Sequence, residues 1–219
     1  ISVMSSHLLD SPIDIAMRRA TSTEESDRLF MVNGGDGSLG VFSILRSQNV
    51  VAPSKFTTSG TFKAVGVDVD DTYVIVNRTI NGASKYFVEH FDASLHTDSA
   101  VFVSAASATG TAAHLPSTLV DILNDGNIEA QQTLNGSGVA TFTRSSATNY
   151  EMGLPFSITV KTMPVEPALK SGGIKGFKKR ILQVNAEVYQ SKAMTVNNQL
   201  VPFRQFGEDI LDSPVTAFT

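Results

Sequence analysis

The chain has 219 residues, of which 42% are hydrophobic and 17% charged, and its formal net charge is -4 at pH 7. This balance predicts a folded chain and excludes intrinsic disorder, while the missing cysteines exclude disulfides and thiolate metal sites. No run approaches the ~18 apolar residues of a membrane helix. The frequent Thr, Ser, Val, Gly and Asn residues favour strands and turns, so we predict an all-β fold.

The first predicted elements are a strand and a hairpin. Apolar and polar residues alternate over residues 13–17, which is typical of a strand, although Ser11 and Pro12 could instead begin a helix. Residues 29–32 and 39–45 then flank residues 33–37, an Asn-Gly-Gly-Asp-Gly run that tolerates positive φ. We therefore expect a hairpin here.

Four further strands are expected before residue 92, separated by short turns that contain Gly, Asp or Asn. They cover residues 50–56, 61–67, 72–79 and 85–91. Four-stranded antiparallel units with this spacing occur in sandwiches, barrels and propeller blades. We predict antiparallel sheets that are propeller-like or sandwich-like.

A change to Ala, Ser and Thr after residue 94 indicates a second module. Residues 117–123, 128–134 and 139–143 predict a small meander with a turn at residues 135–138, which ends near Met152 and Gly153. We expect residues 95–153 to form a small inserted β module. Residues 1–94 and 154–219 would then form the main antiparallel β domain.

The last part of the chain contains two alternating apolar segments joined by a long connection with several prolines. Their apolar residues are Phe156, Ile158 and Val160 in the first segment and Ile181, Val184, Ala186 and Val188 in the second. Both segments are predicted strands, and residues 196–198 are a predicted turn. We expect this final part to rejoin the first sheet.

Two blocks carry a resemblance to a known family. The residues that match in the first block, between Asp27 and Asp92, are Val32, Asn33, Asp36, Gly37, Leu39, Gly60, Arg78, Tyr86 and Glu89. Those of the second are Gly153, Leu154, Pro155, Phe156, Lys161, Thr162, Pro164, Gly176, Lys179, Arg180 and Ile181. Together they resemble the C-terminal portion of tail nozzle proteins, also called tail tubular or DNA stabilisation proteins, of short-tailed bacteriophages. One departure is Pro53, where the family usually has an aromatic residue.

The resemblance implies a structural virion protein without catalysis or cofactor. It implies a ring of copies, a hexamer, in the phage tail, where the ring meets the portal and adaptor and other tail proteins. DNA would pass through the ring without sequence-specific contacts, and no membrane would be involved. Assembly would take place in the bacterial cytoplasm.

Independent inspection of the reactive residues leads to the same expectation of no enzyme. The histidines (His7, His90, His96 and His114) do not have metal-ligand spacing. The carboxylates of Asp68, Asp70 and Asp71 could hold calcium, but a solvated turn explains them better. No nucleophile elbow or phosphate-binding glycine motif occurs, so we expect no catalytic, cofactor-binding or metal-binding residues.

One basic cluster is a candidate contact site. It consists of Lys175, Lys178, Lys179 and Arg180, which surround Phe177. Such a cluster could touch a DNA backbone or an acidic surface of a neighbouring subunit, and a solvated hairpin tip is the alternative.

Two other functions stay open at this point. A carbohydrate-binding β module of a tail fibre or surface protein would suit an all-β chain, but the absence of Trp and the presence of only four Tyr count against aromatic sugar platforms. An enzyme on a propeller scaffold would require convergent carboxylates or histidines in a cleft.

Overall fold

The structure is a computed structural model that describes residues 3–23, 25–146, 148–162, 178, 180–188, 191 and 194–202. The chain divides into two compact units, Ile1–Phe156 and Ser157–Thr219. The described residues contain antiparallel strands and two short 3-10 helices but no α-helix, which confirms the all-β prediction. They form no propeller, and none of their helices is long and apolar enough to cross a membrane.

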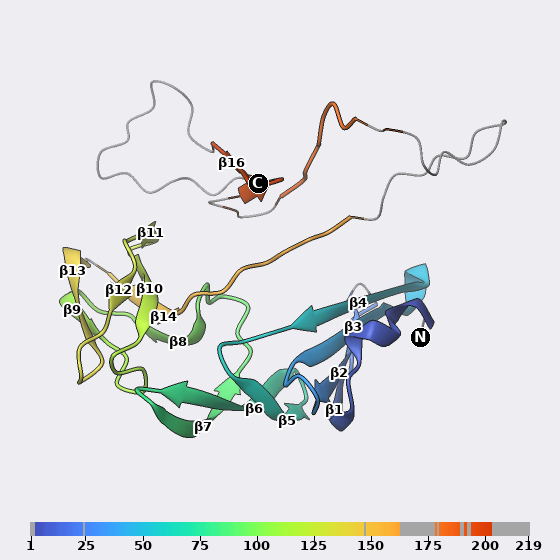
Figure 1. The fold of residues 1–219 in the computed structure, drawn as a ribbon, viewed down its shortest axis with the longest axis horizontal. Coiled ribbons are helices and arrows are strands. Elements are labelled where there is room, and N and C mark those ends of the chain that lie inside the picture. The colour runs from blue at the N-terminus through green and yellow to red at the C-terminus, as the bar shows by residue number, and fades with distance from the viewer. Residues whose placement is uncertain are drawn as a thin grey trace. The chain divides into compact units, whose positions relative to one another are not determined.

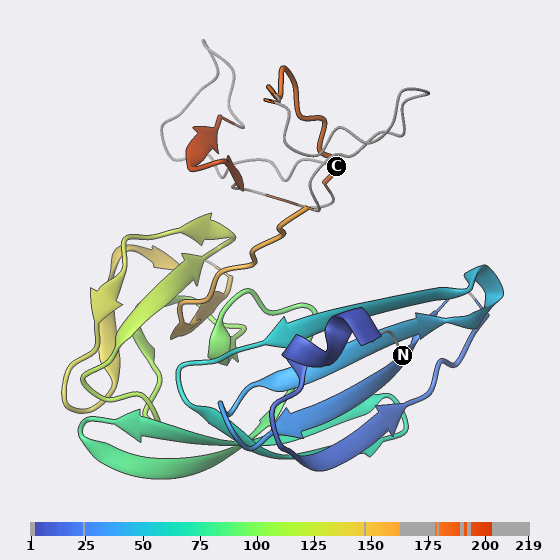
Figure 2. The ribbon, with the colours of Figure 1, turned by 45° about the vertical axis from the view of Figure 1, so that its right-hand side comes forward.

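The first sheet has four strands in the order of the chain, namely β1 (Pro12–Arg18), β2 (Asp27–Asn33), β3 (Leu39–Leu45) and β4 (Val50–Phe56). The 3-10 helix η1 (Val3–Leu8) lies over this sheet (Figure 2), and η2 (Arg46–Gln48) connects β3 to β4. The strand expected at residues 13–17 is confirmed, so the helix alternative is wrong. Pro53, which cannot donate a ladder hydrogen bond, lies on the edge strand β4, where a proline is tolerated.

The predicted hairpin joins β2 to β3 through a turn that Asn33 organises. Its backbone N–H donates to Ser38 O at 2.8 Å, and its backbone carbonyl accepts from Gly37 N–H at 3.0 Å. Gly37 has a φ of 70°, where a side chain would be strained and would also meet Thr61. The turn residues therefore set the register of this hairpin.

The second sheet consists of β5 (Thr61–Asp68), β6 (Asp71–Ile80) and β7 (Ala83–His90), with β6 in the centre. The strands at residues 61–67, 72–79 and 85–91 are thus confirmed in outline. Their grouping with residues 50–56 is wrong, because β4 pairs with β3. A strand pairs with a sheet edge that still has unpaired backbone groups, and the spacing of the predicted strands does not show which edge that is.

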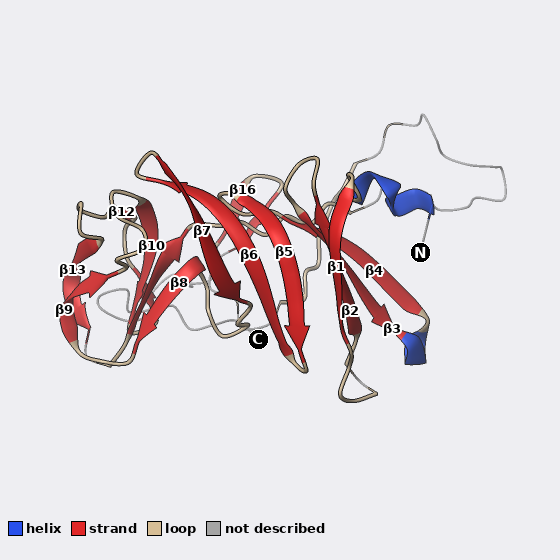
Figure 3. Ribbon diagram, turned by 90° about the horizontal axis from the view of Figure 1, so that it is seen from below, coloured by secondary structure: helices blue, strands red, loops and turns tan. Residues whose placement is uncertain are grey.

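A hydrophobic core, which we call the first core, lies between these two sheets. It contains Phe30, Val32, Leu39 and Val41 from β2 and β3 and Phe62, Val65, Val74 and Val76 from β5 and β6. β1 lies beside β5 (Figure 3), and the backbone N–H of Val65 donates to an Asp14 carboxylate oxygen at 2.9 Å. The two sheets therefore share one apolar layer.

The remaining strands of the first unit surround a second core (Figure 1). They are β8 (Asp98–Val103), β9 (Ser107–Thr111), β10 (Leu119–Asn124), β11 (Asn127–Ile128), β12 (Gln132–Thr133), β13 (Val139–Ser146) and β14 (Tyr150–Leu154). Buried Leu115, Ile122, Met152 and Ile80 belong to this core. Because Ile80 comes from β6, the core joins residues 112–154 to the second sheet.

The predicted meander is confirmed in its first pairing, of residues 117–123 with residues 128–134, and wrong in its second, of residues 128–134 with residues 139–143. β10 pairs with β11, β12 and β14, whereas β13 pairs with β9. Met152 and Gly153 lie in β14, a buried strand between β10 and β8 that ends at Leu154, and the inserted module of residues 95–153 stays a prediction. The turn at residues 135–138 does form, with Gly138 N–H donating to Asn135 O at 2.9 Å.

The two predicted C-terminal strands do not form among the described residues. Residues 155–162 and 180–188 have no strand structure, and Ile158 and Val160 are 82% and 84% exposed. Alternation produces a strand only where a partner strand supplies hydrogen bonds and cover. β15 (Met194–Val196) and β16 (Gln199–Val201) form a hairpin through Asn197 and Asn198, as predicted. The placement of residues 154–219 in the main domain stays a prediction.

Candidate functional site

The predicted basic cluster is described only in part. Lys178 and Arg180 are exposed, while Lys175 and Lys179 lie outside the described residues. The two described side chains are available to a partner, and the role of the cluster stays a prediction.

Several of the histidines and carboxylates singled out in the sequence have local partners. His90 Nε2 lies 2.9 Å from Asp71 Oδ1, and its ring packs against Tyr73 at 5.0 Å between centroids. His114 Nε2 lies 2.9 Å from Ser99 O. Within the part of the chain that the structure describes, no three His, Asp or Glu side chains gather in a way that could hold a metal ion.

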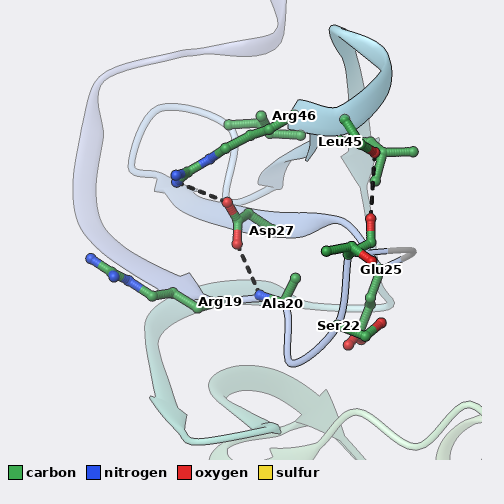
Figure 4. A pocket seen from close by; sticks show the side chains of 10 residues that line it. Arg19, Ala20, Ser22, Glu25, Asp27, Leu45 and Arg46 are labelled. Atoms are coloured by element: carbon green, nitrogen blue, oxygen red, sulfur yellow. Dashed lines mark hydrogen bonds and ion pairs between the residues drawn. The ribbon is translucent and has the colours of Figure 1, made fainter.

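A pocket of about 310 Å³ opens between the β1–β2 connection and the end of β3 (Figure 4). Asp27 connects two of its walls. One carboxylate oxygen accepts from Ala20 N–H at 2.9 Å, and the other pairs with the Arg46 guanidinium at 2.9 Å. Glu25 is held by Arg18 at 2.5 Å. The hydrogen bond from Arg18 and those from Thr21 lower the pKa of Glu25, so this carboxylate is ionised at neutral pH and is a poor proton donor.

A buried ionic network is centred on Arg78, whose side chain is fully buried in β6. Its guanidinium donates to both carboxylate oxygens of Glu89 on β7, at 2.9 and 2.7 Å, and to Asp98 Oδ1 on β8 at 3.0 Å. It also donates to Ser59 O at 3.0 Å and to Thr58 Oγ1 at 2.5 Å. Five hydrogen bonds therefore satisfy all the donors that a guanidinium carries.

The charge of Arg78 is maintained by its partners. Burial alone would lower its pKa, but the hydrogen bonds from the guanidinium to Glu89 and the nearby charge of Asp98 outweigh it, so the pKa is raised. In β6, Arg78 lies between Val76 of the first core and Ile80 of the second. The network thus joins the parts of the first unit that carry the two cores.

A large apolar surface covers the side of the first sheet that faces away from the first core. We call it the first outer face. The registers place on it Ile13, Ile15, Met17, Leu29, Met31, Phe42, Ile44 and Val51. The end of η1 and Leu9 cover it near Gly40, but Ile13 and Ile15 on β1 are 59% and 58% exposed. β1 therefore turns its apolar side chains outward and its polar Asp14 and Arg18 toward β5.

The second sheet also has an apolar side facing away from the first core, which we call the second outer face. It carries Tyr73 and Ile75 of β6 and Tyr86 and Val88 of β7. Ile75 and Val88 are direct cross-strand partners, and Val88 is 75% exposed. Soluble proteins rarely leave contiguous apolar patches on two faces unless something covers them.

Comparison with models of known protein families gave no match, and comparison with curated proteins gave none either.

Sequence reasoning missed both outer faces and the Arg78 network. The network had a visible signal: Val74, Val76, Arg78 and Ile80 alternate on the inward side of one strand, and Glu89 follows on the next strand. An arginine in such a position requires buried acidic partners. The outer faces had no equivalent signal, because alternation does not say which side of a strand faces the core.

Proposed function

We propose that this protein is a structural component of the tail of a short-tailed bacteriophage, a part of the nozzle that forms the channel wall for DNA retention and ejection. One observation carries the proposal. Most residues of the first block through which the sequence resembles tail nozzle proteins are ones on which the packing of the first unit depends, namely Val32, Asn33, Gly37, Leu39, Gly60, Arg78 and Glu89, so the shared pattern in this block is a pattern of fold.

Asn33 illustrates this dependence. Its fully buried side chain donates to Leu8 O at 2.9 Å and to Ser38 Oγ at 2.8 Å, and it accepts from Asp10 N–H at 3.0 Å. It thereby ties the segment before β1 to the β2–β3 turn. An aliphatic side chain at this position would remove all three of these hydrogen bonds.

The packing of the first unit depends in the same way on Gly60 and Arg78, which come later in the first block of the resemblance. A side chain at Gly60 would lie 2.4 Å from Asn77 O, and its φ of 154° is unfavourable for other residues. The close approach brings the β4–β5 connection, with Ser59, to the guanidinium of Arg78. Such positions demand one residue type for packing alone, as expected in a protein whose role is mechanical.

The proposed role requires stiffness and a surface that does not retain DNA. Two apolar cores and the Arg78 network stiffen the first unit. The net charge of -4 favours passage of DNA over adhesion, since tight binding depends on clustered Lys and Arg. The basic cluster of Lys175, Lys178, Lys179 and Arg180 would act locally, on the DNA backbone or on an acidic surface of a neighbouring subunit.

Electron microscopy of the protein mixed with a phage portal and adaptor complex tests the proposal. We expect ring density that continues the tail below the adaptor, and gold-labelled antibodies against the protein should mark the tails of intact virions. Label absent from tails would contradict the proposal. Specific binding on a glycan array, without such a ring, would favour a carbohydrate-binding module instead.

The basic cluster is tested by the double variant Lys179→Glu with Arg180→Glu. We expect weaker ring assembly or weaker DNA retention with an unchanged circular dichroism spectrum. The matched control is Lys63→Glu with Lys85→Glu, which makes the same change of charge at two exposed positions of the second sheet. Equal behaviour of the two double variants would remove the cluster from the proposed mechanism.

A further inference from the structure

We infer that copies of this chain associate head to tail, the first outer face of one copy stacking on the second outer face of the next. The inference rests on the proposed function and deepens it, because it names the surfaces through which subunits of a ring would meet. It begins from the arrangement of the two sheets. They enclose the first core between them, so their outer faces point in opposite directions, and among the described residues neither face has a partner sheet.

The two outer faces match in chemistry. The first presents exposed Ile13, Ile15 and Met17, and the second presents exposed Tyr73, Ile75, Tyr86 and Val88. Aliphatic and aromatic side chains of this kind already pack together in the first core, where valines and phenylalanines of both sheets meet. A third sheet could therefore continue the stack on either side.

The charges at one end of the sheets select a second copy as that third sheet. Within a copy, Arg18 at the end of β1 donates from Nε to Asp70 O at 2.9 Å, so the end of β1 lies beside the β5–β6 turn. Arg19 comes next in the chain and is exposed, and no ion pair holds it among the described residues. Its charge is available at the same end of the first sheet.

Acidic residues occupy the corresponding end of the second outer face. Asp68 and Asp71 are cross-strand partners on this face, and the side chain of Asp71 is 58% exposed. If the next copy stacks as the first sheet stacks on the second, its Arg19 meets this pair. The contact would repeat between copies the relation that Arg18 has with Asp70 within one copy.

The size of the faces indicates a weak contact. Four strands of seven residues give the first sheet a face of roughly 440 Å², but η1 and Leu9 cover part of it and the second sheet has three strands, so the area available to each partner is smaller. A total below about 900 Å² corresponds to a weak interface, where association is transient. Because the two faces differ, the contact is heterologous and generates rings or filaments.

Sedimentation velocity over micromolar to millimolar concentrations tests the inference. We expect reversible growth of the wild-type chain beyond a dimer, and about tenfold weaker association for Ile15→Glu and for Val88→Glu. Ile128→Glu, at an exposed isoleucine away from both faces, is the matched control and should associate as the wild type does. A wild-type chain that stays monomeric, or an equal loss in the control, would overturn the inference.

Mixing the two variants distinguishes head-to-tail from symmetric association. Ile15→Glu keeps an intact second outer face and Val88→Glu an intact first one, so their mixture should form dimers and stop there. No rescue on mixing would overturn the inference. If either variant fails to fold, Arg19→Asp, which should weaken association, and its mixture with Asp71→Arg, which should restore it, provide the same test.

This experiment separates the two proposals. Antibody labelling of virion tails together with unaffected association of the face variants would contradict only the stacking surfaces. Association through these faces without any tail labelling would contradict only the phage function.

Discussion

Strand β6 and residues 156–160 carry the same alternation of apolar and polar side chains, but they have opposite environments. In β6, Val74 and Val76 are buried in the first core, and β5 and β7 supply hydrogen bonds on both edges. In residues 156–160, the apolar Ile158 and Val160 are exposed and no strand forms. The same pattern thus gives a central strand in one region and an unpaired segment in the other.

Strand β1 shows a third outcome of this pattern. It pairs with β2 from Asp14 to Arg18, with an irregularity between Pro12 and Asp14, but Ile13 and Ile15 face outward while Asp14 and Arg18 face β5. Alternation therefore indicates only that the two sides of a segment differ in polarity. Partner strands decide whether it becomes a strand, and polar contacts such as those of Asp14 and Arg18 decide which side is buried.

The largest effect is expected at Arg78, the charged residue on the otherwise apolar inward side of β6. Arg78→Ala would leave Glu89 and Asp98 facing each other without a counter-charge, and breaking a buried pair typically costs 3–5 kcal/mol. Because the Glu89 and Asp98 side chains keep 17% and 24% exposure, we expect a loss near the lower end, about 3 kcal/mol. Urea unfolding measures it.

The control for that experiment is Arg28→Ala, an exposed arginine on β2, which should change the unfolding free energy by less than about 0.5 kcal/mol. Similar losses in both variants would contradict the structural role of the Arg78 network.

A matched pair of valines tests the comparison itself. Val76→Ala should lower the unfolding free energy by about 2 kcal/mol, since a fully buried side chain loses two methyl groups and leaves a cavity. Val160→Ala, at a position that is 84% exposed, should have almost no effect. Thermal and urea unfolding of the two variants measure the difference. A comparable loss at Val160 would mean that residues 156–160 pack as a strand after all.

The smallest expected effect concerns the turn between β2 and β3 in the first unit. Hydrogen bonds from Lys55 and Ser38 hold the pKa of Asp36 well below its ordinary value. A carboxylate with a depressed folded-state pKa adds stability above its unfolded-state pKa of about 3.9, and this stability is lost as the pH falls below that value.

Melting temperatures at pH 7 and at lower pH values check this expectation. Asp36→Asn should be slightly less stable than the wild type at pH 7, and the difference should shrink as the pH falls below about 4. Lys55→Met removes the main donor to Asp36 and should reduce the pH dependence over the same window. A difference that grows toward low pH would contradict the assignment.

Many strand boundaries of the first unit could be predicted, because the turn residues that mark them act locally. The Asn-Gly-rich turn at residues 33–37 and the glycines at turns place the strand boundaries within a few residues, since few residue types tolerate positive φ. The hairpins β2–β3, β5–β6 and β6–β7 follow from this spacing. The Arg78 network could also have been anticipated, from an arginine on the inward side of an alternating strand.

Chain composition and turn residues alone determined that this protein is built of antiparallel β-strands, because backbone preferences act over a few residues. Only the tertiary structure decided that β4 joins the first sheet, that β13 pairs with β9, and that β1 exposes its isoleucines. These choices depend on contacts between residues far apart in the chain, and the same alternating pattern is compatible with either edge and either face.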